Sequence, residues 1–259
     1  MPLLPTAEGH LEYVVTGVGS PTTVFAHGLA GAIAQTRPLG SGVHGTRVFL
    51  HFRGHGASSA PESPWTYPAL ADELRLISDH TDAGRAVGVS LGAGALTRLL
   101  ADTPDRFERL VFFLPAVLDR PRQDAALARL EQMADYVDHR DIAGIEALLL
   151  AEQPVGVRTR PDVAHFVAQQ ARVLAGTSVS RALRELPYEV PISDRTRLHS
   201  VIAPALVIGQ EGDDAHPLWV AEELADALPD SRLHVFDDDG ALWSHRGALR
   251  ELIAGFLNS

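Results

Sequence analysis

The sequence contains no cysteine and no lysine among its 259 residues. Without cysteine it can form neither a disulfide bond nor a thiolate metal site, a composition that fits the reducing cytoplasm. Without lysine it can form no Schiff base with a carbonyl substrate or with pyridoxal phosphate. Any covalent chemistry must therefore use a hydroxyl, an imidazole or a carboxylate.

Long apolar runs and an excess of positive charge are also missing. No run is long enough to cross a bilayer, and residues 1–9 lack the basic and apolar parts of a signal peptide. Acidic residues outnumber basic ones by 33 to 22, which gives a net charge of −11. Because nucleic acids and anionic membranes bind basic surfaces, this balance argues against both. We expect a cytoplasmic protein whose partner is a small molecule; the sequence does not indicate its oligomeric state.

Short apolar segments alternate with helical patterns along most of the chain. Buried strands followed by amphipathic helices predict an α/β fold with a doubly wound, mostly parallel sheet, whose functional loops lie at the carboxyl ends of the strands. The predicted strands cover residues 11–16, 23–26, 47–52, 86–89, 110–114, 205–209 and 233–236.

Residues 119–194 break this alternation, because they show three helical stripes and no convincing strand. We therefore predict an α/β core made of residues 1–118 and 195–259, with residues 119–194 inserted as a helical cap. The cap is expected to roof the site and to set the substrate range.

Ser90 lies between two glycines, in the run Gly-Val-Ser-Leu-Gly at 88–92. A buried strand precedes it and a helical pattern follows, whereas an ordinary glycine-flanked strand end is the alternative. A sharp strand-to-helix turn would hold the serine in a rarely populated backbone conformation and leave room only for glycine at 88 and 92. The start of the helix directs the Leu91 N–H at whatever lies over Ser90, as an oxyanion requires. We predict that Ser90 is a nucleophile.

A serine hydroxyl needs an imidazole to take its proton and a carboxylate to orient that imidazole. Asp213 follows the sixth predicted strand, and His245 lies between the seventh strand and the last helix. The order Ser90, Asp213, His245 is one of the known chain orders of such a triad. The N–H of Leu29, in the loop after the second predicted strand, is the expected second oxyanion donor.

These motifs together resemble the α/β-hydrolase superfamily, in its cap-bearing branch of esterases, lactonases, carbon–carbon hydrolases and cofactor-free perhydrolases. The resemblance covers nearly the whole chain. It rests on His27-Gly28, the run Arg-Gly-His-Gly-Ala-Ser at 53–58, the Ser90 turn, the acidic loop 209–217 and the late His245. It implies the fold and a hydrolytic triad, and it says little about the substrate.

The chain departs from the family pattern at three places. His51 stands where an aspartate is usual, so no aspartate is present there for a salt bridge. The acidic loop holds two adjacent aspartates; Asp213 is favoured as the triad acid, with Asp214 and Asp119 as alternatives. His245 does not follow the usual glycine.

The remaining histidines have structural interpretations. His27 and His55 are expected to brace loops, His216 to cap the helix after the acidic loop, and His234 to lie on the surface. His51 and His55 have i, i+4 spacing but lie in a turn with a glycine between them, which argues against a helical zinc pair. If another histidine serves as the base, His216 is the first candidate.

The sequence thus predicts a serine hydrolase that cleaves a small or medium, largely uncharged ester or lactone without cofactor or metal. Ser90 attacks the carbonyl, His245 transfers the proton, Asp213 orients His245, and the Leu29 and Leu91 N–H groups bind the oxyanion. Carbon–carbon hydrolysis and peracid formation on the same triad are alternatives. A non-catalytic ligand-binding or receptor protein is the alternative from another class, and a complete triad argues against it.

Overall fold

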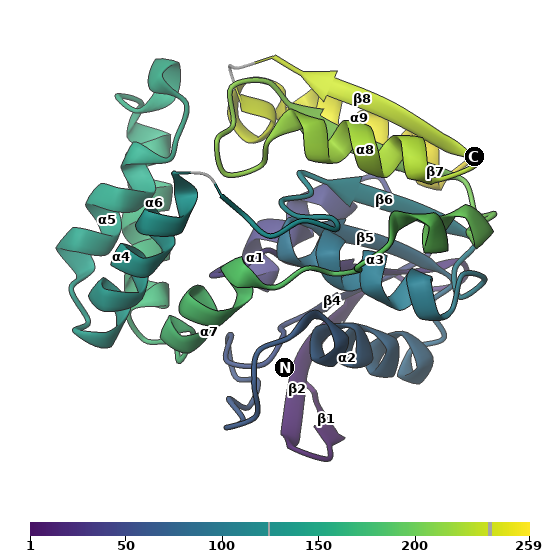
Figure 1. Ribbon diagram of the computed structural model, residues 1–259, viewed down its shortest axis with the longest axis horizontal. Helices are drawn as coiled ribbons and strands as arrows, with labels where there is room; N and C mark the ends of the chain where they lie inside the picture. Colours follow the sequence, from purple (N-terminus) through teal and green to yellow (C-terminus); the bar gives the residue numbers. More distant parts are fainter. Residues whose placement is uncertain (124, 238–239) are drawn as a thin grey trace.

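An eight-stranded sheet forms the centre of the computed structural model, which describes residues 1–123, 125–237 and 240–259 (Figure 1). The strand order is β1-β2-β4-β3-β5-β6-β7-β8. The strands are β1 (Leu3–Thr6), β2 (Gly9–Thr16), β3 (Thr22–Ala26), β4 (Thr46–Leu50), β5 (Arg85–Val89), β6 (Arg109–Phe113), β7 (Ala205–Gln210) and β8 (Ser231–Phe236).

The sheet is mostly parallel. Only the pairs β1–β2 and β2–β4 are antiparallel, and the strands from β4 to β8 in the sheet order all run the same way. The predicted α/β fold class is therefore confirmed. Strand β1 was missed because it has only four residues, which alternate between exposed and half-buried and so carry little apolar signal.

Helices cover both faces of the sheet. On one face, α2 (Tyr67–His80), α3 (Leu91–Asp102) and α8 (Leu218–Ala227) bury their apolar sides in one core. On the other face, α1 (Ile33–Thr36) and α9 (Arg246–Leu257) contribute to a second core. Two separate cores are what a doubly wound sheet requires. In the part of the chain that the structure describes, no helix has the length and apolar character to cross a membrane.

The segment between β6 and β7 contains helices and connecting loops, and no strand in its described part. Figure 1 shows α4, α5 and α6 at the left, beside the sheet rather than on it. Its elements are α4 (Ala126–Asp138), α5 (Ile142–Ala151), η2 (Val155–Val157), α6 (Pro161–Leu174), α7 (Ser180–Glu185), η3 (Leu186–Tyr188) and η4 (Arg195–Ser200). Helix α6 buries Val163 and Val167, whereas Val173 is exposed. The predicted cap limits, 119 and 194, remain a prediction.

Candidate active site

Ser90 lies in a sharp turn between the central strand β5 and helix α3. Its backbone has φ 50° and ψ −107°, a conformation that residues with a side chain rarely adopt. A Cβ added at Gly88 would lie 2.5 Å from the carbonyl oxygen of Gly92, and one at Gly92 would lie 2.5 Å from that of Ala26. Both glycines are thus sterically required, because the turn presses strand and helix together.

The side chains of Ser90, His216 and Asp213 form a continuous hydrogen-bonded chain. His216 Nε2 lies 3.0 Å from Ser90 Oγ, and His216 Nδ1 lies 2.8 Å from Asp213 Oδ2. An ionised Asp213 accepts the Nδ1–H, which leaves Nε2 free to accept the serine proton. This is the geometry that activates a serine hydroxyl as a nucleophile.

Asp213 is held in its ionised form and in a fixed orientation. Its Oδ1 accepts hydrogen bonds from the backbone N–H groups of Ala215 at 2.9 Å and of His216 at 3.1 Å. Burial alone would raise the pKa of Asp213, but His216 and these two N–H groups outweigh burial, and the pKa is lowered. The carboxylate is therefore negative at neutral pH, as an orienting acid must be.

The structure does not bring His245 to Ser90. His245 is the N-cap residue of α9, its Nε2 lies 2.7 Å from Asp237 Oδ1, and its ring stacks on Phe236. The preceding π-helical turn η5 (Gly240–Ser244) is directed toward the helices between β6 and β7, since Trp243 donates its indole N–H to Gln153 at 2.8 Å. Here the structure differs from the sequence prediction.

His216 instead occupies the place expected for His245, and it does not cap α8 as the sequence analysis expected. The N-cap residue of α8 is Pro217, with no side-chain cap bond. One signal in the sequence could have identified His216 as the partner of Ser90. His216 follows Asp213 by three residues in one loop, and the chain order Ser, Asp, His is the same with either histidine. A spacing of three residues does not by itself bring the side chains of Asp213 and His216 together. In the structure the turn at Asp213 does so.

The two expected oxyanion donors both border the site. Leu91 is the first residue of α3, so its N–H has no partner within the helix, and the N–H of Leu29 forms no hydrogen bond to any described residue. Both residues line the same cavity as Ser90. A Cβ at Gly28 would lie 3.3 Å from the Cβ of Ser90, so this loop passes directly over the serine.

Buried histidines hold the Leu29 loop in place. His55 Nε2 accepts the N–H of Ala30 at 3.1 Å and its Nδ1 donates to the carbonyl of Arg53, while His27 Nε2 accepts the N–H of Phe52. Burial lowers the pKa of His55 to about 4 and that of His27 well below its usual value. Both are therefore neutral acceptors at pH 7, and each ties the loop to the turn after β4.

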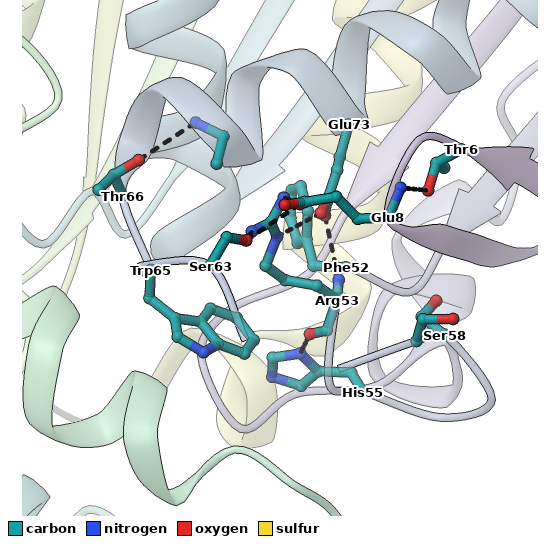
Figure 2. Close-up of polar contacts among 12 residues, drawn as sticks. Thr6, Glu8, Phe52, Arg53, His55, Ser58, Ser63, Trp65, Thr66 and Glu73 are labelled. Atoms are coloured by element: carbon teal, nitrogen blue, oxygen red, sulfur yellow. Dashed lines mark hydrogen bonds and ion pairs between the residues drawn. The ribbon is translucent and has the colours of Figure 1, made fainter. Parts of the chain in front are cut away.

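Figure 2 shows how that turn is anchored in its own right. Arg53 pairs with Glu73 of α2 and also donates to Ser63 at 3.0 Å, and Ser63 donates to Glu8 at 3.0 Å. The carbonyl of Arg53 is the one that accepts the Nδ1–H of His55 (Figure 2). The Arg-Gly-His-Gly run is thus a scaffold that holds the Leu29 loop in place.

His51 does find an acidic partner, although the usual aspartate is absent. Its Nδ1 donates to Glu12 of β2 at 2.7 Å, and its Nε2 accepts the N–H of Ile33 at 2.9 Å. Burial lowers the pKa of His51, with Glu12 opposing it. The sequence analysis did not identify this pairing, because Glu12 and His51 lie far apart in the sequence.

The alternative acids lie elsewhere. Asp119 forms a two-bond ion pair with Arg195, at 2.6 and 2.7 Å, and the carboxylate of Asp214 is exposed. Among residues 1–123, 125–237 and 240–259, no three histidine or acidic side chains gather as they would to hold a metal ion.

A cavity of about 140 Å³ opens over Ser90. Its walls come from the core loops, from α2 and α3, and from the segment between β6 and β7. The lining residues are Leu29, Tyr67, Ser90, Leu91, Ala116, Val117, Arg122, Ala126, Leu130, Glu152, Leu186, Pro187, Ala215 and His216. The wall is mostly apolar, and its charged side chains, Arg122 and Glu152, have opposite signs.

Fold and site together define a class of protein. Residues 21–243 match the family of the alpha/beta hydrolase fold, and the chain belongs to this family. The expected superfamily is thereby confirmed.

Particular relatives differ in activity. A poly(3-hydroxyalkanoate) depolymerase of Ectopseudomonas oleovorans is 26% identical over 71% of this chain and 65% of its own length. A putative non-heme bromoperoxidase of Mycobacterium tuberculosis is 29% identical over 90% of this chain and 91% of its own. The crystal structure of a bromoperoxidase from Bacillus anthracis superposes with a TM-score of 0.81 at 21% identity, over 96% of both chains, which shows the shared fold.

Proposed function

We propose that this protein is a serine hydrolase that cleaves short, uncharged carboxylic esters or lactones through an acyl-enzyme. The observation that carries the proposal is the chain from Ser90 Oγ through His216 to Asp213, with contacts of 3.0 and 2.8 Å. The base in this proposal is His216, in place of His245.

In the first half-reaction, Ser90 Oγ attacks the ester carbonyl while His216 Nε2 takes the hydroxyl proton. The carbonyl oxygen becomes an oxyanion, which accepts hydrogen bonds from the N–H groups of Leu29 and Leu91; each such donor is worth roughly 2.7–4 kcal/mol in the transition state. The carbon–oxygen bond to the alcohol then breaks, and His216 returns its proton to the departing alcohol.

In the second half-reaction, water attacks the acyl-enzyme while His216 Nε2 removes one of its protons. The tetrahedral intermediate collapses, the acid leaves, and the proton returns to Ser90. Asp213 keeps the Nδ1–H tautomer throughout and stabilises the imidazolium that forms in each half.

The size and charge of the cavity support a small neutral substrate. A volume of about 140 Å³ is below the range of roughly 300–1,000 Å³ that drug-sized ligands occupy. The charged residues Arg122 and Glu152 in the cavity wall have opposite signs, so neither sign of charge dominates the wall.

Peracid formation is a second candidate, favoured by the names of the bromoperoxidase relatives. Hydrogen peroxide would replace water in the second half-reaction, so that the acyl-enzyme and hydrogen peroxide give a peracid and free serine. The same triad serves both reactions, and the competing nucleophile decides the product.

A fluorophosphonate probe and two histidine variants test the proposal. We expect the probe to label Ser90, as located by peptide mapping, and His216→Ala to lower kcat on ethyl butyrate by at least about 10³-fold. His245→Ala is the matched control, because its imidazole contacts Asp237 rather than Ser90, and it should keep its turnover.

Each contrary result has a definite meaning. Loss of activity in His245→Ala with retention in His216→Ala would restore the assignment made from the sequence. Labelling of a different serine would overturn the proposed nucleophile, and the absence of both labelling and turnover would favour a ligand-binding protein. Peracid assayed in the presence of hydrogen peroxide decides between the two candidate reactions.

A further inference from the structure

Tyr67 is a wall residue of the Ser90 cavity that the proposed hydrolysis does not use. It is the first residue of α2, where Thr66 caps the helix by accepting the N–H of Ala69, and it is only 4% exposed. Its ring lies against α3, since a Cβ added at Gly94 would be 2.3 Å from the Tyr67 Cε1 atom. Gly94 is thus the residue that makes room for this ring.

The ring is also close to the nucleophile. The N–H of Gly94 donates to the carbonyl of Ser90 at 3.1 Å, so Tyr67 packs one helical turn, about 5.4 Å, along α3 from Ser90. Both Tyr67 and Ser90 line the same cavity.

The hydroxyl of the buried Tyr67 has no hydrogen-bond partner among the residues that the structure describes. The Tyr67 hydroxyl oxygen is not one of the fully enclosed polar atoms that lack a partner, and Tyr67 lines the cavity over Ser90. A buried phenol without a partner loses the hydrogen bonds that it had in water, which is costly unless a ligand restores one. Burial also raises the pKa of Tyr67, so the hydroxyl keeps its proton and can donate it.

We propose that Tyr67 is a specificity residue that hydrogen-bonds an oxygen substituent on the acyl chain, so that the preferred substrates are esters of short hydroxy- or oxo-acids. This inference rests on the proposed ester hydrolysis and names its substrate class. In this proposal the acyl chain runs from Ser90 along α3, so that a substituent on its third carbon lies on the side of Gly94 and Tyr67.

A neutral substituent fits better than a carboxylate. Arg122 lines the same cavity, but Glu152 lines it too, and Arg122 already donates to the carbonyl of Ala215. The charged lining therefore has no net positive charge to balance an anion, whereas the Tyr67 hydroxyl can both donate to and accept from a neutral oxygen.

Four ethyl esters of equal acyl chain length separate these possibilities: ethyl butyrate, the two enantiomers of ethyl 3-hydroxybutyrate, and monoethyl succinate. The released acid is titrated, and kcat/KM is obtained for each ester. We expect the wild type to prefer one 3-hydroxybutyrate enantiomer over butyrate, since a fixed hydroxyl group distinguishes the two configurations.

Tyr67→Phe removes only the hydroxyl oxygen, and we expect it to reduce the ratio of kcat/KM for the preferred 3-hydroxybutyrate over butyrate by roughly 5- to 10-fold. The ratio is measured within one preparation, so a change in the amount of folded enzyme cancels. Tyr13→Phe is the matched control, because Tyr13 bonds His80 at 3.1 Å on the surface, and it should leave the ratio as in the wild type.

An unchanged ratio in Tyr67→Phe, or a wild type that does not distinguish the hydroxy ester from butyrate, overturns this inference while ester hydrolysis stands. A preference for monoethyl succinate overturns it in favour of recognition by Arg122. A wild type that hydrolyses none of these esters and is not labelled by the fluorophosphonate overturns the proposed function, and the inference with it.

Discussion

At the scale of single residues, one imidazole tautomer recurs around the site. His27, His51, His55 and His216 each place Nδ1 against a fixed acceptor and leave Nε2 to accept a hydrogen bond. In the first three, Nε2 accepts a backbone N–H and fixes a loop. In His216, Nε2 faces the hydroxyl of Ser90. The acceptor at Nδ1 therefore sets the tautomer, and the group at Nε2 determines what the residue does.

The buried histidines make the folded protein sensitive to acid. An unfolded histidine has a pKa near 6.5, whereas burial lowers the pKa of His55 to about 4. Between these two values the unfolded chain binds more protons than the folded chain. The contribution of neutral His55 to the free energy of unfolding is therefore complete above about pH 6.5. It decreases as the pH falls and is lost near pH 4, a total loss of about 3 kcal/mol for His55 alone.

His55→Gln tests this prediction, because glutamine can accept the N–H of Ala30 but does not titrate. We expect the variant to be less stable at pH 7.5 and to lose less stability than the wild type between pH 7.5 and 4.5, as measured by urea unfolding. His44→Gln, at an exposed histidine, is the control. Equal losses in His55→Gln and the wild type would show that His55 titrates normally in the folded state.

At the scale of elements, the turn between β5 and α3 concentrates backbone strain at Ser90. Ser90 has a positive φ, and strand β3 passes so close that Gly92 touches the carbonyl of Ala26. Such strain persists only when the surrounding packing enforces it. The hydrogen bond from the Ser90 N–H to the carbonyl of Phe113, at 2.9 Å, is part of that enforcement.

Gly92→Ala should therefore destabilise the protein by roughly 1–3 kcal/mol, because its Cβ would lie 2.5 Å from the carbonyl oxygen of Ala26. Gly247→Ala is a matched control at the second residue of α9, where an added Cβ has no neighbour within 4 Å. The control should be neutral or more stable by up to about 1 kcal/mol. Thermal and urea unfolding measure both, and equal effects would refute the steric account of the turn.

At the scale of the whole molecule, ion pairs join the two ends of the segment 119–194 to the core. Arg195 binds Asp119 by two hydrogen bonds and Glu223 of α8 by one of 2.9 Å, and Arg120 binds Glu223 at 2.6 Å. The two chain crossings into the helical segment are thus held together at one point. Asp119, an alternative triad acid in the sequence analysis, is engaged in this cluster.

We expect Asp119→Asn to lower the free energy of unfolding by about 1 kcal/mol, a modest value because Arg195 is partly exposed and solvent screens the pair. Turnover should stay within about twofold of the wild type. Arg195 lowers the pKa of Asp119 in the folded protein. The ion pair therefore contributes to the free energy of unfolding at any pH above the pKa of Asp119 in the unfolded chain, and this contribution is lost as the pH falls through the lower pKa of the folded state. Asp102→Asn, which breaks more exposed pairs with Arg98 and Arg197, should cost less. A collapse of turnover in Asp119→Asn would assign it a role at the imidazole.

Much of the architecture could be predicted because its causes are local. The fold class was predicted from apolar runs of strand length and from helical stripes, and the turn at Ser90 from the glycines at 88 and 92. Each of these patterns depends only on neighbours within a few residues. The exposed pattern of β1 carried no such signal. The partner of His51 was not predicted for a related reason, since Glu12 is distant in sequence and adjacent only through the β2–β4 pairing.

The sequence by itself determined the fold class, the strained turn at Ser90 and the order of serine, acid and histidine. Only the tertiary structure decided which histidine faces Ser90, because His216 and His245 both follow Asp213 at the carboxyl end of a strand. The turn that Asp213 makes with the N–H groups of Ala215 and His216 directs one imidazole toward Ser90. The other imidazole, that of His245, lies beside Asp237, next to the turn that Trp243 ties to Gln153. Chain order is a one-dimensional property, whereas hydrogen-bond reach of about 3 Å depends on how distant segments pack.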